Sequence, residues 1–111
     1  MERRISEADW KVFREVRVSA LDRFCEHVLS EAGRLVAETG QSSHQRYLAV
    51  FKLIERMDKK LGDTFDDPRR STALLQLMLM RSQDLLTEEE FARFSSETRA
   101  TVQGVLESFF A

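Results

Sequence analysis

Proline and glycine are scarce in this chain of 111 residues, which contains one proline and four glycines. A β-sandwich or β-barrel of this length needs a turn about every ten residues, and such turns are rich in glycine and proline. The scarcity therefore argues against an all-β fold. Since 42% of the residues are hydrophobic and 32% are charged, the composition also differs from that of a disordered chain. We expect a single all-helical domain spanning residues 1–111.

Cysteine, net positive charge and long apolar runs are lacking as well. The single cysteine, Cys25, cannot form an internal disulfide and argues against a cysteine-based zinc site. The 17 basic and 19 acidic residues give a net charge of −2, without the basic excess typical of nucleic-acid binders. The longest nearly apolar run, residues 73–80, is too short to cross a bilayer. Because the N-terminal segment also lacks an apolar signal-peptide region, we expect a cytoplasmic protein that does not enter a membrane.

Helix-start signals occur at five places. Three are a serine or threonine followed three residues later by an acidic residue or glutamine, as in a capping box: Ser6 and Asp9, Ser42 and Gln45, and Thr87 and Glu90. Asp67 before Pro68 predicts a fourth helix start, and Ser95 predicts a fifth. The apolar spacing between these signals predicts five helices, over about residues 7–38, 43–61, 68–83, 88–93 and 96–109. The expected fold is an all-α bundle of about five helices, with a long N-terminal helix and a short C-terminal helical pair.

The first predicted helix is too long for a compact domain of this size. Its residues would form a helix roughly 48 Å long, whereas a compact domain of this length is roughly 35 Å across. Either the helix breaks near Gly33 or its end projects and needs a partner. A homodimer in which two first helices share the uncovered stretch would resolve the mismatch. The third helix is apolar on nearly every side, so we expect it at the centre of the bundle or in an oligomer interface.

No motif predicts a catalytic, cofactor or metal site. The two histidines, His27 and His44, lie in different helices, and Cys25 lies about 200° around the helix from His27, so that these two cannot share an ion. The chain lacks an EF-hand loop, a nucleophile elbow and a glycine-rich phosphate loop. We therefore expect a protein that is not an enzyme and that carries no cofactor.

A basic stripe is the first candidate binding surface. Its residues are Lys52, Arg56 and Lys60, which repeat every four residues, followed across a loop by Arg69 and Arg70. Such a stripe can bind an anionic partner. It can instead pair with the acidic residues Asp22 and Glu26 of the first helix, and internal pairing is favoured because basic and acidic faces of packed helices usually neutralise each other.

Apolar side chains form the second candidate surface. The candidate interface residues are Trp10, Leu79, Met80 and Phe110. The leading hypothesis is a non-catalytic helical interaction or adaptor protein that forms a homodimer and acts through helix-face contacts. It could also bind a different protein as its partner. The alternative is a small regulatory protein that binds nucleic acid or a nucleotide through the basic stripe, although the net charge disfavours nucleic acid.

Overall fold

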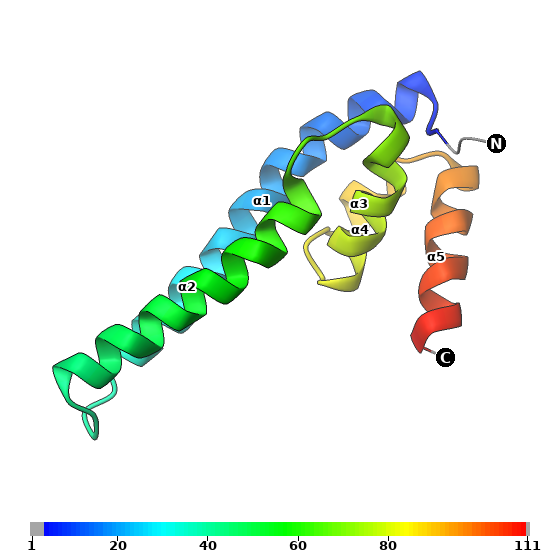
Figure 1. Ribbon diagram of the computed structural model, residues 1–111. Helices are drawn as coiled ribbons and strands as arrows, with labels where there is room; N and C mark the ends of the chain where they lie inside the picture. Colours follow the sequence, from blue (N-terminus) through cyan, green and yellow to red (C-terminus); the bar gives the residue numbers. More distant parts are fainter. Residues whose placement is uncertain (1–3, 111) are drawn as a thin grey trace.

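The computed structural model describes residues 4–110, with the backbone alone at Phe110, and contains five α-helices (Figure 1). They are α1 (Glu7–Val36), α2 (Ser43–Phe65), α3 (Arg70–Ser82), α4 (Glu88–Ala92) and α5 (Ser96–Phe110). The described residues form no β-strand. The predicted all-α fold, with its long N-terminal helix and short C-terminal helices, is confirmed. Among these residues, no helix is both long and apolar enough to cross a membrane.

The long first helix projects from the rest of the molecule. α1 runs for 30 residues without a break, so Gly33 lies inside the helix. α1 and α2 form an antiparallel hairpin whose connecting loop lies far from both termini, while α3, α4 and α5 gather near the start of α1 (Figure 1). The described residues therefore extend over 53 × 29 × 26 Å. Of the two outcomes expected for the first helix, projection is the one observed.

The core lies in the part of the molecule that we call the head, residues 4–24 and 61–110. Its most deeply buried apolar side chains come from α1, α2, α3 and α5: Phe13, Ala20, Phe65, Ala73, Leu77, Met80 and Val102. The rings of Phe24 and Phe65 meet edge to face, with centroids 5.9 Å apart. α3 contacts α1, α2 and α5, which confirms the central position expected from its apolar surface. We call residues 25–60 the projecting hairpin.

Local capping signals locate most helix starts. Reciprocal capping boxes join Ser42 to Gln45 and Thr87 to Glu90. The Ser95 hydroxyl accepts a hydrogen bond from the Thr98 N–H at 3.3 Å. These starts are confirmed because each cap depends only on residues within one turn.

The start of α3 and the end of α2 differ from the predictions. Asp67 and Pro68 do not start α3, whose N-cap is Arg69, because Asp67 takes a left-handed conformation with φ of 50°. The second helix was predicted to end at about residue 61, before Gly62, but it continues to Phe65, which is completely buried. Arg17 of α1 donates a hydrogen bond to the Phe65 carbonyl at 2.5 Å. Packing against α1 thus extends α2 by one turn beyond its glycine.

Candidate functional site

One side of the hairpin carries apolar side chains that the described part of the chain leaves uncovered. We call this surface the hairpin face and define it by seven residues: Val18, Cys25, Leu29 and Val36 of α1, and Tyr47, Phe51 and Ile54 of α2. Leu29 and Tyr47 are each 67% exposed, and Cys25 is half-buried. Exposed apolar surface of this extent is a common mark of an interaction site.

Helix geometry places these residues on one side. Successive residues of a helix are about 100° apart, so Val18, Cys25, Leu29 and Val36 all lie within about 40° of one another around α1. By the same spacing Tyr47, Phe51 and Ile54 lie within about 60° of one another around α2. Leu29 and Ile54 line one pocket together. The two helices therefore contribute to a single continuous face.

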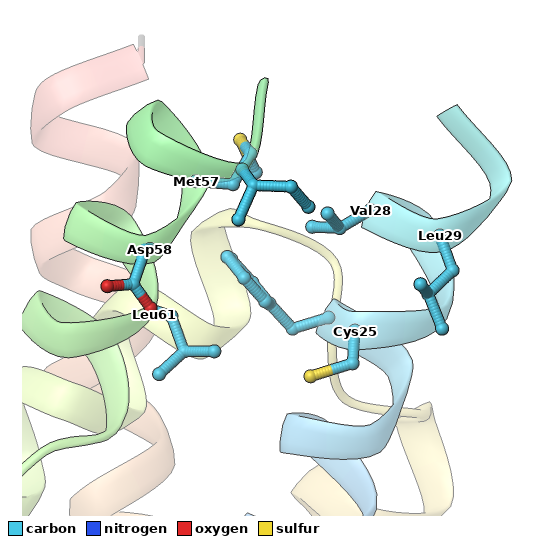
Figure 2. A pocket seen from close by; sticks show the side chains of 8 residues that line it. Cys25, Val28, Leu29, Met57, Asp58 and Leu61 are labelled. Carbon is cyan, nitrogen blue, oxygen red and sulfur yellow. The ribbon is translucent and has the colours of Figure 1, made fainter. Parts of the chain in front are cut away.

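A shallow pocket of about 320 Å³ lies in this face between the two helices. Figure 2 shows Cys25 and Leu29 on α1 and, across the pocket, Met57, Asp58 and Leu61 on α2. Asp58 is the charged residue among the lining side chains. The pocket is therefore suited to an apolar side chain rather than to a charged ligand.

The structure divides the predicted basic stripe into two parts. Lys52, Arg56 and Lys60 are exposed and lie about 140° or more around α2 from Tyr47, away from the hairpin face. In the described part of the chain, no ion pair joins them to Asp22 or Glu26. The expected pairing between a basic and an acidic stripe is therefore not found.

The two arginines after the loop are engaged within the chain. The guanidinium of Arg69 forms an ion pair with Asp67 at 2.6 Å. Arg70 is half-buried, and its Nε donates a hydrogen bond to the Ile5 carbonyl at 3.1 Å. The stripe that faces solvent is thus reduced to the three residues of α2, of which Arg56 interacts electrostatically with Glu31 of α1.

The four predicted interface residues differ in how exposed they are in the structure. Met80 is wrong as a surface residue, because α3 lies at the centre of the head and leaves this side chain no exposed area. Leu79 is half-buried. Trp10 is half-buried and stacks on Phe13 with centroids 5.5 Å apart. The side chain of Phe110 lies outside the part that the structure describes.

The hairpin face itself was not predicted from the sequence. Helical spacing places Tyr47, Phe51 and Ile54 on the apolar side of the second helix but does not show that they remain exposed. A usable signal was present: α2 has two adjacent apolar stripes, one with buried Leu53 and one with Phe51. A single neighbouring helix covers only one such stripe. The second stripe is therefore the mark of a missing neighbour.

Asp9 forms a polar cluster with α5. Its buried carboxylate accepts hydrogen bonds from the Ser95 N–H at 2.9 Å, the Ser95 hydroxyl at 2.6 Å and the Thr98 hydroxyl at 2.7 Å. Burial raises the pKa of Asp9, but these hydrogen bonds outweigh burial, so that its pKa lies below the ordinary value of 3.8. The Asp9 N–H does bind the Ser6 hydroxyl as predicted, at 3.1 Å. The Asp9 carboxylate, however, joins α1 to α5.

The remaining titratable side chains do not assemble into a metal site. Glu31 lies one turn from His27 but forms an ion pair with Arg34. Among residues 4–110, no cluster of three or more His, Cys, Asp or Glu side chains is arranged to hold a metal ion.

Comparisons with known protein families, with curated proteins and with solved structures found no match to this chain.

Proposed function

We propose that this protein is a non-catalytic helical interaction protein that associates with a second copy of itself through the hairpin face. The observation that carries the proposal is the exposure of six large apolar side chains on one side of the hairpin: Val18, Leu29, Val36, Tyr47, Phe51 and Ile54. Burying such side chains removes apolar area from water, which is the main favourable term in protein association.

The geometry of a two-helix hairpin explains why this face needs a partner. In the head, α3 and α5 add further helices around α1 and α2. Beyond the head, each helix of the projecting hairpin has only the other as a neighbour (Figure 1). Two more helices laid on the hairpin face complete a four-helix bundle, in which each helix buries both of its apolar stripes. Each newly buried side chain contributes about 1 kcal/mol, because roughly half of its area is exposed in the single chain.

A second candidate function concerns the basic stripe. The exposure of Lys52, Arg56 and Lys60, without ion pairs to Asp22 or Glu26, favours binding of nucleic acid or a nucleotide there. The net charge of −2 and the engagement of Arg69 and Arg70 within the chain weigh against it. We therefore place it second.

Sedimentation equilibrium over a range of protein concentrations tests the proposal. We expect a dimer whose dissociation constant changes little between about 0.1 M and 1 M salt, because apolar burial is not screened. The double substitution Leu29→Glu with Phe51→Glu should weaken association by at least about 100-fold, because it places charges in the apolar interface. A chain that stays monomeric at every concentration would contradict the proposal.

The matched control replaces Lys52, Arg56 and Lys60 by Gln. This variant should associate like the unmodified protein, because the three residues lie away from the hairpin face. A 260/280 nm absorbance ratio that is raised on purification, falls in high salt and is lost in this variant would favour the second candidate instead.

A further inference from the structure

The four hairpin-face positions of α1 have a symmetric spacing. Val18, Cys25, Leu29 and Val36 are separated by intervals of 7, 4 and 7 residues, which read the same from either end. The centre of the pattern is position 27. A second α1 laid antiparallel about this centre places Val18 opposite Val36 and Cys25 opposite Leu29, in both halves of the contact. Such reciprocity is what a twofold interface between identical chains requires.

Four positions of α2, at the face or in its pocket, have a symmetric spacing at the same height. Phe51, Ile54, Asp58 and Leu61 are separated by intervals of 3, 4 and 3 residues, centred on position 56. Tyr47 falls outside this pattern, because its counterpart, Phe65, is buried. The pocket is lined by Cys25 and Leu29, on either side of the first centre, and by Ile54 and Asp58, on either side of the second. One twofold axis across the hairpin can therefore serve both helices.

From these patterns we infer that the second copy packs its hairpin face antiparallel on the first, with the twofold axis crossing α1 near His27 and α2 near Arg56. This inference rests on the proposed function. It places the two heads at opposite ends of a four-helix bundle. Leu29 of the second copy then lies over Cys25, where it fills the pocket of about 320 Å³.

The size of the face fits this partner. From Val18 to Val36 the face is about 27 Å long, and two helices side by side are about 20 Å wide. The flat footprint is thus about 540 Å², and a corrugated surface of side chains buries more than its flat footprint. The area buried per partner therefore reaches the range of about 600–1,000 Å² that is usual for a stable interface.

Charges at the edge of the face agree with the antiparallel register. Glu55 and Lys59 are exposed, and Glu55 lies about 40° around α2 from Phe51, whereas Lys59 lies about 40° further, next to Lys52. Pairing about position 56 brings Lys59 opposite position 53 of the second copy, within one turn of that copy's Glu55. Two opposite-charge contacts then border the apolar centre, which is the usual arrangement of an interface. Edge charges of this kind favour one register over others more than they add affinity.

Disulfide trapping tests the register. In a Cys25→Ser background, Val18→Cys with Val36→Cys should give a covalent dimer after mild oxidation, seen on a non-reducing gel. The two positions are about 27 Å apart along one helix, so a disulfide within one chain is excluded. Each single variant should remain at least about 10-fold less cross-linked, because positions 18 and 36 do not meet their own copies.

The matched control pairs Val18→Cys with Arg34→Cys. Arg34 is exposed and close to Val36 in height, but it points away from the hairpin face. This pair should not cross-link. Circular dichroism establishes that each variant is folded before oxidation.

The outcomes separate the register from the proposed function. Sedimentation that shows a dimer, together with cross-linking by a single variant or by the control pair, would overturn the antiparallel register and leave the self-association proposal standing. If the protein is a dimer but the double variant Val18→Cys with Val36→Cys does not cross-link, the register is likewise overturned and the self-association proposal stands. A folded chain that sediments as a monomer at every concentration overturns both.

Discussion

The head and the projecting hairpin contain similar amphipathic helices but bury them to different extents. In the head, Leu77 and Met80 have no exposed surface. Among residues 25–60, only Val28 and Leu53 are buried, whereas Leu29 and Tyr47 are two-thirds exposed. Hydrophobicity does not separate the two regions, because both are rich in leucine and aromatic residues. The two regions differ in the number of helices that surround each helix. An exposed apolar side chain therefore marks a place where a neighbouring helix is absent.

The polar contacts of the two regions differ in the same way. Besides exposed ion pairs such as Arg69 with Asp67, the head contains the buried Asp9 cluster and the ion pair of Arg23 with Glu90, which is largely shielded from solvent. In the projecting hairpin the ion pair joins Arg34 and Glu31, whose side chains are 64% and 43% exposed. Exposed pairs contribute little to stability. The head is therefore the region in which single substitutions should reduce stability most.

The largest loss of stability should come from truncating a buried leucine of the head, compared with an exposed leucine of the hairpin face. Leu77→Ala should lower the free energy of unfolding by about 3 kcal/mol, because it leaves a cavity in a closed core. Leu29→Ala should change it by less than about 0.5 kcal/mol at concentrations where the chain is monomeric. Urea denaturation followed by circular dichroism measures both values. Equal losses would mean that the hairpin face is covered within the chain.

A smaller effect should follow from Asp9→Asn. The amide cannot accept all the hydrogen bonds that Ser95 and Thr98 donate to the carboxylate, so we expect a loss of about 2 kcal/mol at pH 7. Thermal or urea unfolding measures the loss. Ser6→Ala is a useful comparison, because it removes the cap of α1 but leaves the cluster with α5 intact.

The same substitution has a defined pH dependence. The pKa of Asp9 is lower in the folded chain than its ordinary value of 3.8, so its contribution is present above about pH 4 and is lost as the pH falls through the folded pKa. The difference in stability between the unmodified protein and Asp9→Asn should therefore be greatest at neutral pH and shrink in acid. A difference that grows in acid would show that the pKa is raised instead.

An effect smaller than that of Asp9→Asn should come from Glu90→Gln. Glu90 accepts hydrogen bonds from Arg23 at 2.5 Å and from the Thr87 N–H at 2.9 Å. Glutamine retains the capping acceptor for Thr87 but loses the charge that binds Arg23. We expect a loss of about 1 kcal/mol, reduced in high salt. Salt titration of the unfolding midpoint checks this, and a loss independent of salt would assign the effect to packing.

Local signals explain why much of the fold was predictable. The caps at Ser42, Thr87 and Ser95 act over three residues, so the chain contains all the information needed to locate those helix starts. The errors at Asp67 and Gly62 have a different origin. Phe65 is buried against Phe24, which is distant in the sequence, and this contact carries α2 past its glycine.

The candidate site was less predictable for the same reason. The positions of Lys52, Arg56 and Lys60 follow from helix periodicity, and their exposure agrees with a stripe on one face. Exposure of an apolar residue depends on which helices surround it. Met80 and Leu29 are both large apolar side chains, yet Met80 is buried and Leu29 is exposed.

The order of residues alone therefore determined the helical class, most helix starts and the excessive length of the first helix, because capping and amphipathic spacing act within a few residues along the chain. The tertiary structure decided that α1 stays unbroken, that α3 is enclosed by the head, and that one side of the hairpin is left bare. These outcomes depend on contacts between distant segments. Burial is a property of the whole arrangement, and no single helix carries it.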